Sequence, residues 1–467
     1  MTQKLTKLVA TIGPATETEE IIGKLIDAGM NVARFNTKHS SPEWHQERIA
    51  RVRQVARQKG AAVGIMLDLQ GPEIRINLPG ETPFDLVEGE TAIFTARENL
   101  EAVKKVLIPQ NVIDALQVGN VVLLDDGACE FEVTQKNSDH LVLKALSACT
   151  VKHRKTMNVP GVTIDMPSLI EADYAQLDGA SGNCEIDFVA LSFVRSAADI
   201  EFLREELVKR KMCAGIIAKI ETQAALDHLE EIVDASDAVM VARGDLGVEM
   251  PYEELTFWQK RIIDLCRASS KPVITATQML KSMTDAPRPT RAEVSDVAHA
   301  IYDGTDAIML SEETTIGKYP VRAVATQAKI AAFNEPYAND VLQIALTDDP
   351  QEAITNAAVE LVESSGLEIA GLINMTISGR SAHLLSSLHP SKPIIAVTAS
   401  ERVYFALSLS YGVQPVLATK EQAGDLSQAL VLLKDKGLVT KGQRIVATHG
   451  VPHATRGTNT ISIVEVS

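Results

Sequence analysis

Residues 5–36 read LTKLVATIGPATETEEIIGKLIDAGMNVARFN, and this stretch decides the fold class. It begins with a short apolar run over 5–12 and ends with a second run over 31–36, both typical of buried strands. Between these runs, apolar residues recur at the spacing of one helix face: Ile21, Ile22, Leu25 and Ile26. A strand, a helix and a second strand in this order predict a parallel sheet.

The signals that limit these elements extend the pattern along the chain. Thr16 and Glu19 have the spacing of a capping box at the start of the first helix. Gly29 is expected to end that helix. A second helix is expected over 41–60, where a serine and a proline precede the apolar positions and a glycine follows them. A third strand over 62–69 completes the alternation.

The pattern changes after residue 70. From 71 to 161 the apolar segments are short and are separated by turns, which is typical of a small β module. The strand–helix alternation then resumes, with strands expected at 188–193, 215–220, 238–242, 272–276 and 307–310. Three strands before the β module and five after it make eight, the number in a TIM barrel.

Beyond residue 335 helices and strands alternate once more, which predicts an open α/β domain. We therefore expect an α/β protein of three parts. A TIM (β/α)8 barrel takes 1–70 and 162–335, an inserted small β domain takes 71–161 after the third strand, and a C-terminal open α/β domain takes 336–467.

Charge and composition exclude several classes of function. The chain has 467 residues, and its formal net charge is 45 − 61 = −16, so its surface repels nucleic acid and anionic lipid. No apolar run approaches the ~18 residues of a membrane span, and the first residues do not resemble a secretory signal. The 5 cysteines are scattered without a CxxC pair. We expect reduced thiols, a cytoplasmic location, and neither nucleic acid nor membrane as a partner.

Polar residues follow the predicted barrel strands at their C-terminal ends, where the sites of TIM barrels lie. They are Gly13, Pro14, Arg34, Asn36, Asp68, Ser192, Lys219, Glu221, Arg243, Asp245, Thr277, Ser311 and Glu313. Lys219 and Glu221 are two residues apart and share one face of a strand. Glu221 and Asp245 have the chemistry of a Mg²⁺ site that leaves positions to substrate and water. A structural Lys219–Glu221 ion pair beside a turn aspartate is the alternative that these residues alone leave open.

Eight short motifs, in one order along nearly the whole chain, resemble pyruvate kinase. They are ATIGPA (10–15), NVARFN (31–36), GPEIR (71–75), NVPG (158–161), AKIE (218–221), MVARGDLG (240–247), ATQML (276–280) and PTRAEVSD (289–296). The resemblance implies transfer of the phosphoryl group of phosphoenolpyruvate to ADP, followed by protonation of the enolate to pyruvate, in the last step of glycolysis. It also implies the architecture of barrel, β lid and C-terminal regulatory domain.

The resemblance further implies a role for each matching residue. The catalytic residues would be Lys219, Arg34 and Thr277. The substrate would contact Arg34, Lys219, Gly244, Asp245 and Thr277. Glu221 and Asp245 would bind Mg²⁺ or Mn²⁺. The nucleotide would contact Asn36, His39, Arg75 and Lys155. A loose phosphoryl-transfer transition state needs positive charge and alignment more than a nucleophilic side chain, which fits these residue types.

The monovalent-cation site of the family departs from its usual pattern here. Asn36 and Asp68 would line it, but Lys38 stands where the family usually has serine, and Leu69 stands where it has threonine. We expect the Lys38 ammonium to lie beside Asp68 as a built-in cation, which would make activity independent of K⁺. Glu73 argues the other way, because it is the residue that K⁺-dependent members carry.

A second site is expected in the C-terminal domain. Residues 376–381 (TISGRS) place small hydroxyl groups and an arginine at a helix start, which suits a phosphate. The resemblance implies a phosphorylated allosteric effector there, bound by Thr376, Ser378, Gly379, Arg380 and Ser381, with Arg456 completing the pocket. An ordinary capped helix start remains the alternative. The family also implies a homotetramer.

Two other functions compete with this interpretation. One is a Mg²⁺-dependent barrel lyase or aldolase acting on pyruvate-like acids, which would share the polar rim but needs no β lid. The other is a catalytically impaired sensor on the pyruvate kinase fold, caused by the changes at Lys38, Leu69 and Glu312. Glu312 replaces a glycine of the family and would be strained if its position requires a positive φ.

Overall fold

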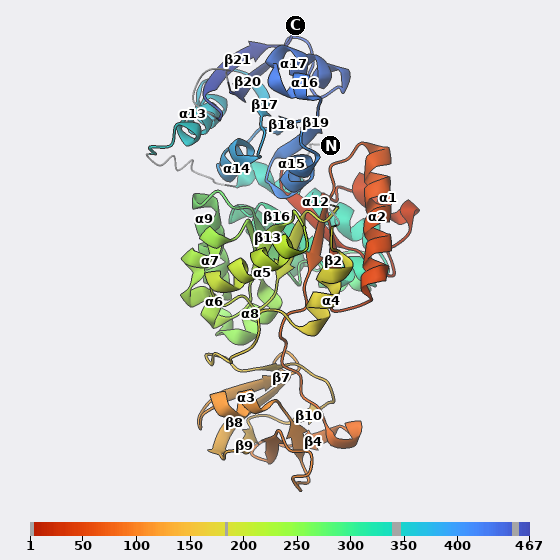
Figure 1. Cartoon of the computed structure of the whole chain (residues 1–467), viewed down its shortest axis with the longest axis vertical. Helices are drawn as coiled ribbons and strands as arrows, with labels where there is room; N and C mark the ends of the chain where they lie inside the picture. The colour runs from red at the N-terminus through yellow and green to blue at the C-terminus, as the bar shows by residue number, and fades with distance from the viewer. Residues whose placement is uncertain (1–3, 183–184, 339–346, 451–456) are drawn as a thin grey trace.

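The computed structural model describes residues 4–182, 185–338, 347–450 and 457–467. Three bodies follow one another along its long axis (Figure 1). The inserted β module lies at one end, the barrel in the middle and the C-terminal domain at the other end. Arg456, expected in the effector pocket, lies outside the described residues.

Eight parallel strands close into the predicted barrel, in the order β1-β16-β15-β14-β13-β12-β3-β2. The strands are β1 (Lys7–Thr11), β2 (Val32–Asn36), β3 (Gly64–Asp68), β12 (Phe188–Leu191), β13 (Gly215–Ile220), β14 (Ala238–Ala242), β15 (Val273–Ala276) and β16 (Ala307–Leu310). The β module leaves the barrel between β3 and β12, so the predicted position of the insert is confirmed.

Helices surround the barrel and two short ones lie at its rim. The outer helices are α1 (Glu19–Asp27), α2 (Pro42–Lys59), α4 (Glu171–Gly179), α5 (Ala197–Lys209), α6 (Gln223–Asp227), α7 (Leu229–Ala235), α9 (Leu255–Ala268), α10 (Arg291–Tyr302) and α12 (Pro320–Asn334). The rim helices are α8 (Arg243–Glu249) and α11 (Glu312–Thr315). None of the helices that the structure describes combines the length and apolar character that crossing a bilayer requires.

The helix ends were predicted with mixed success. Helix α2 begins as expected, with the Ser41 hydroxyl accepting from the Trp44 amide, and ends at Gly60 with φ 61°. The capping box expected at Thr16 is wrong. Thr18 caps α1 instead, because the Thr16 hydroxyl accepts from the Gly13 amide and donates to the Thr314 carbonyl.

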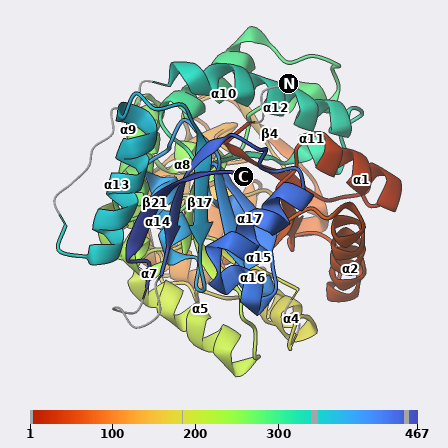
Figure 2. The same cartoon turned by 90° about the horizontal axis from the view of Figure 1, so that it is seen from above.

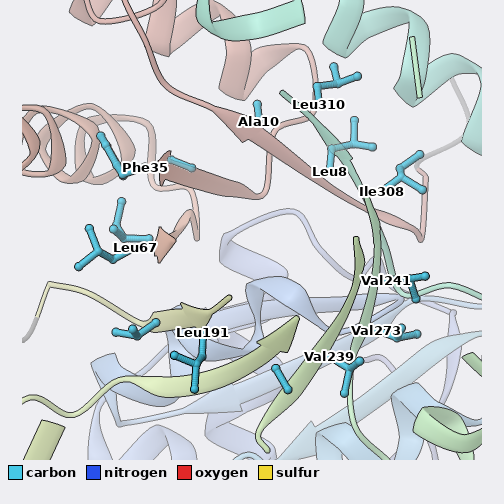
Figure 3. Packing of buried hydrophobic residues seen from close by; sticks show 14 of the residues in the cluster. Leu8, Ala10, Phe35, Leu67, Leu191, Val239, Val241, Val273, Ile308 and Leu310 are labelled. Atoms are coloured by element: carbon cyan, nitrogen blue, oxygen red, sulfur yellow. The ribbon is translucent and has the colours of Figure 1, made fainter. Parts of the chain in front are cut away.

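Alternate strand residues face two apolar layers, as the period of a strand requires. Leu8 and Ala10 point toward the surrounding helices, where they join the core shown in Figure 3. Val9 points into the barrel, where Leu409 of the C-terminal domain packs at the end at which the strands begin. The barrel is therefore a packed core, and its chemistry is confined to the ends of the strands.

The inserted module has two sheets around one core. Its elements are β4 (Phe84–Leu86), β5 (Thr91–Thr95), β6 (Lys105–Leu107), α3 (Gln110–Ala115), β7 (Val121–Leu124), β8 (Cys129–Lys136), β9 (His140–Ala145), β10 (Cys149–Val151) and β11 (Met157–Asn158), with a 3₁₀ turn at η1 (Pro79–Glu81). Hydrogen bonds join six strands in the order β11-β7-β8-β9-β5-β6, and β10 with β4. The module is thus a six-stranded and a two-stranded sheet that share buried residues such as Leu86 and Phe131.

The C-terminal domain is the expected open α/β sheet, in the order β19-β18-β17-β20-β21. It contains α13 (Pro350–Ser364), β17 (Ile369–Met375), α14 (Arg380–Ser387), β18 (Ile394–Thr398), α15 (Glu401–Ala406), β19 (Val413–Leu417), α16 (Lys420–Gly424), α17 (Leu426–Asp435), β20 (Arg444–His449) and β21 (Thr460–Glu465). The 3₁₀ turn η5 (Leu407–Leu409) also belongs to this domain. The 3₁₀ turns η2 (Tyr252–Glu254), η3 (Lys281–Thr284) and η4 (Glu335–Tyr337) come before it in the chain.

This domain covers the N-terminal ends of the barrel strands. The Gly412 amide donates to the Leu5 carbonyl over 3.0 Å, and the Tyr411 amide donates to Asp306 over 3.3 Å. Figure 2, seen from that side, shows the domain lying over the barrel. The opposite end of the barrel, where the strands finish, faces the β module.

Candidate functional site

A buried ammonium group lies at the centre of the rim. Lys219, in β13, places its Nζ 2.6 Å from Ser192 Oγ, 2.8 Å from Glu221 Oε1 and 3.4 Å from Asp68 Oδ1. Burial alone would lower the pKa of Lys219, but the attraction of Asp68 and Glu221 outweighs it and raises that pKa above its ordinary value. The group therefore carries a fixed positive charge at any working pH.

A second cation lies beside it. Arg34, in β2, directs both Nε and Nη2 at Asp68 Oδ2 over 2.6 Å, and Nη1 donates to Thr11 Oγ1 over 2.9 Å. Burial tends to raise the pKa of Asp68, yet Lys219 and Arg34 together lower it. The three side chains thus form one buried network, and Arg34 is held in a fixed orientation.

The carboxylate of Asp245, in the first turn of α8, has no hydrogen bond or ion pair to the residues that the structure describes. Burial, then repulsion from Glu221 and Glu73, raises the pKa of Asp245 to about 7. Glu221 is itself held, since its Oε2 accepts from the Phe193 amide over 2.8 Å. Negative charge is therefore in surplus at this end of the rim, which a cation would offset.

These donors fit a hard divalent cation. No group of three or more His, Cys, Asp or Glu side chains suited to a metal occurs within the described ranges. Mg²⁺, however, is usually held by one or two carboxylates and takes its other ligands from substrate phosphates and water. Glu221 and Asp245 supply such a pair.

The residue that follows the neighbouring strand, β15, has a strained backbone and an unpartnered hydroxyl among the described residues. Thr277, directly after β15, has φ 70°, which is rare for a β-branched residue. Its hydroxyl is buried without a hydrogen-bond partner among the described residues. A Cβ added to Gly244 would lie 3.6 Å from that hydroxyl, so the Gly244 backbone and the Thr277 hydroxyl border the same space. Strain of this kind, costing about 1–3 kcal/mol, is typical of functional sites.

Arg243 holds the Thr277 turn in place, although it was expected only as one of the polar rim residues. Its Nη2 donates to the Thr277 carbonyl over 2.8 Å, and both terminal nitrogens bind Asp296 over 2.6 and 2.7 Å. Ser192, likewise expected only at the rim, accepts the hydrogen bond of Lys219. The signal for both was their position at a strand end, which indicates location but not role.

A cavity of about 140 Å³ separates the rim from the β module. Glu73 and Asn158 of the module line it, as do Phe193 and Asp245 of the barrel. The Asn158 side-chain amide donates to Glu249 Oε1 across this junction over 2.8 Å. The two bodies therefore enclose one space, and Asp245 is among the residues that line it.

The residues expected at the nucleotide divide between these bodies. Asn36 is the last residue of β2, and the exposed His39 follows that strand at the barrel rim. Arg75 and Lys155 lie together in the module, because Arg75 pairs with Thr156 in an isolated bridge. Arg75 also contacts Glu73, and Lys155 Nζ lies 2.8 Å from Asp125 Oδ1. Both cations are partly exposed.

Lys38 does not lie against Asp68, so the expected pairing is wrong. Its Nζ is 2.8 Å from Glu73 Oε1 instead, because Arg34 and Lys219 already engage Asp68. The Lys38 charge nevertheless acts on the site, since it lowers the pKa of Asp245 against the stronger effects that raise it.

Glu312 also differs from expectation. It begins helix α11 and is not among the residues with positive φ, so the anticipated backbone strain is absent at this position.

The 376–381 loop lies in the C-terminal domain, on the far side of the barrel from the rim. Thr376 Oγ1 accepts from the Gly379 amide over 3.0 Å, and Ser378 Oγ accepts from the Arg380 amide over 3.5 Å. Arg380 forms an ion pair with Asp349. The buried Ser381 hydroxyl donates to Asn374 Oδ1 over 3.1 Å.

Comparison with known proteins yields one consistent family. Residues 3–324 match the family model described as the pyruvate kinase barrel domain, and residues 352–464 match that of the pyruvate kinase alpha/beta domain. A pyruvate kinase of Geobacillus stearothermophilus is 41% identical over 475 residues, covering 99% of this chain and 80% of the relative. One of Staphylococcus aureus is 42% identical, covering 97% and 79%.

A solved structure agrees with these sequence matches. The crystal structure of a pyruvate kinase from Cryptosporidium parvum superposes with a TM-score of 0.93 at 35% sequence identity. The alignment covers 100% of this chain and 97% of that chain. The similarity thus extends over barrel, module and C-terminal domain together.

Proposed function

Because the chain belongs to the pyruvate kinase family, we propose that it transfers the phosphoryl group of phosphoenolpyruvate to ADP, giving pyruvate and ATP. The observation that carries this is the rim itself, where two fixed cations, Lys219 and Arg34, lie beside the carboxylates Glu221 and Asp245. A coupled assay with lactate dehydrogenase, phosphoenolpyruvate and ADP tests it. No NADH oxidation at saturating substrates would reject the proposal.

Each rim residue has a role in this reaction. Lys219 and Arg34 place positive charge around the phosphoryl group, which a loose transition state requires. The family depends on a divalent metal, which Glu221 and Asp245 would hold as Mg²⁺ or Mn²⁺. When bound, the cation supplies Lewis-acid polarisation of the enolate oxygen. The Gly244 backbone and the Thr277 hydroxyl would bind the substrate, with Thr277 near the path of proton delivery.

The β module would serve as a lid. Arg75 and Lys155 would contact nucleotide phosphates from the module, and Asn36 and His39 from the barrel. Closure of the module over the cavity would exclude water and so limit hydrolysis of phosphoenolpyruvate.

The competing functions are less well supported. A barrel lyase or aldolase has no need for an inserted β module. The matched pyruvate kinase structure, however, aligns with the whole of this chain, the module included. A sensor without turnover should have lost part of the rim, yet Lys219, Glu221 and Asp245 are all in place. The same coupled assay separates these alternatives, because neither would form pyruvate and ATP from phosphoenolpyruvate and ADP.

We further propose that Lys38 replaces K⁺, through its ion pair with Glu73 rather than through Asp68. The expected result is full wild-type activity in tetramethylammonium buffer, with little stimulation by K⁺. Lys38→Ser should then require added K⁺, because it removes the fixed charge. Activity of both proteins with and without K⁺ measures this. Many-fold stimulation of the wild type by K⁺ would refute it.

We also propose that the 376–381 loop binds a phosphorylated activator. Backbone amides of the loop and the Ser378 hydroxyl would hold the phosphate, and Arg380 would exchange Asp349 for it. A panel of sugar phosphates and AMP at sub-saturating phosphoenolpyruvate should include at least one that increases the rate several-fold. Hyperbolic kinetics without any response would contradict the proposal.

The remaining proposals concern organisation. The domain limits of 1–70 with 162–335, 71–161 and 336–467, a homotetrameric assembly and a cytoplasmic location all agree with the family. Size-exclusion chromatography with light scattering tests the assembly state.

A further inference from the structure

A buried carboxylate at the root of the β module has no assigned role. We propose that Asp173 pins the outgoing chain crossing from barrel to module, and that it positions the Lys219 ammonium through Ser192. Its effect on activity rests on the function proposed above, whereas its effect on the backbone does not.

Asp173 joins two segments that are far apart in sequence. It lies in the first turn of α4 and is fully buried. Its Oδ1 accepts from the Gln70 amide over 2.8 Å, and its Oδ2 accepts from the Gly71 amide over 3.1 Å. Oδ2 also accepts from the Ile170 amide over 3.1 Å. The chain leaves β3 for the module at Gln70 and Gly71, so Asp173 binds the outgoing chain from a helix of the barrel, while its bond to Ile170 caps that helix.

A capping role alone does not account for this arrangement. A carboxylate at this helix position caps the helix by accepting one hydrogen bond, here from the Ile170 amide. Here burial raises the pKa of Asp173, against the effect of the three backbone donors. Burying a carboxylate is costly unless hydrogen bonds compensate it. The hydrogen bonds from the Gln70 and Gly71 amides compensate for the burial of the carboxylate and link it to the chain that enters the module.

The pinned backbone is connected to the rim. Gly71 has φ 69°, and a Cβ added there would lie 2.9 Å from Ser192 Cβ, so the outgoing chain packs directly on Ser192. Ser192 Oγ donates to the Leu69 carbonyl over 2.7 Å and accepts from Lys219 Nζ over 2.6 Å. These directions are fixed, because an ammonium group only donates. A shift of residues 69–71 would therefore move the hydroxyl that orients Lys219.

Asp173→Asn and Asp173→Ala test the pin directly. The asparagine amide keeps one acceptor oxygen and turns a donor toward the other amides, so it cannot accept from Gln70, Gly71 and Ile170 together. Hydrogen–deuterium exchange of peptides covering Gln70 and Gly71 should be faster in both variants. The kcat of the coupled assay should fall about tenfold, as expected when a supporting hydrogen bond is lost. KM for phosphoenolpyruvate should change less, because Lys219 acts on the transition state.

Two further variants separate positioning from general stability. Asp187→Asn is the matched control, since Asp187 is a buried carboxylate that binds the Ile65 amide and Arg53 at the start of β3. It should lower thermal stability and leave both kcat and exchange at Gln70 and Gly71 unchanged. Ser192→Ala should lower kcat without faster exchange at those amides, because its Cβ still packs on Gly71.

Each outcome decides part of the proposal. Unchanged exchange at Gln70 and Gly71 in both Asp173 variants would overturn the pin. Faster exchange with unchanged kcat would overturn the link to Lys219. If Asp173→Ala fails to fold, Asp173→Asn carries the test. An inactive wild type would reject the proposed function, and the exchange measurement would still decide whether Asp173 pins the module.

Discussion

Lys219→Met is expected to abolish phosphoryl transfer while leaving phosphoenolpyruvate binding mostly intact. The ammonium of Lys219 is a fixed charge held by Ser192, Glu221 and Asp68. Charge aimed at a transition state lowers the barrier, whereas uniform binding does not. Loss of one such group costs about 10²–10³-fold in kcat. Coupled assays give kcat, and calorimetric titration with phosphoenolpyruvate gives the binding constant.

The same substitution leaves Asp68 and Glu221 without their common partner. Removing one member of a buried charge network costs about 3–5 kcal/mol, so the melting temperature should also fall, and circular dichroism must verify the fold at the assay temperature. Lys209→Met is a suitable control, because Lys209 is an exposed helix residue that pairs with Glu206 away from the rim. Near-normal kcat in Lys219→Met would remove Lys219 from the reaction.

Glu221→Ala and Asp245→Ala are expected to have the second largest effect, on activation by Mg²⁺. Each variant removes one of the two carboxylates whose negative charge is in surplus at the rim. The Mg²⁺ concentration for half-maximal activity should rise at least ~10-fold, with a lower maximal rate. Titration of activity with Mg²⁺ and with Mn²⁺ measures both quantities.

Glu253→Ala provides the control for these variants. Glu253 follows α8 closely in sequence but is exposed in the η2 turn, so its loss should not change the Mg²⁺ titration. If Glu221→Ala and Asp245→Ala also keep the wild-type titration, the metal site lies elsewhere.

Elements limited by local signals were predictable from sequence. Strand β14 occupies Ala238–Ala242 as expected, and α2 begins after Ser41, because apolar runs and caps act over a few residues. Thr16 shows where this fails. It has the spacing of a cap, but its hydroxyl is bound by Thr314, which is 298 residues away in the chain. No pattern of neighbouring residues in the sequence predicts that contact.

The candidate site was likewise predictable only in part. The residue types at the strand ends were predictable, because parallel barrel strands all finish at one rim. Their partners were not, because partners depend on the register between strands. Asn36 lies opposite Asp68 in the β2–β3 pairing, and this register places Arg34 against Asp68. Lys38 is left to pair with Glu73, which comes from the inserted module.

The docking of the C-terminal domain against the N-terminal ends of the barrel strands has a consequence for the order of events during synthesis. Lys7, in the first strand, donates its ammonium to the Val413 carbonyl, 406 residues later in the chain. At a translation rate of about 5–20 residues per second, that partner emerges roughly 20–80 s after the lysine. The Lys7 ammonium therefore lacks this hydrogen-bond acceptor until residue 413 of 467 has been made. We expect the nascent barrel to remain incomplete at the start of its first strand until then.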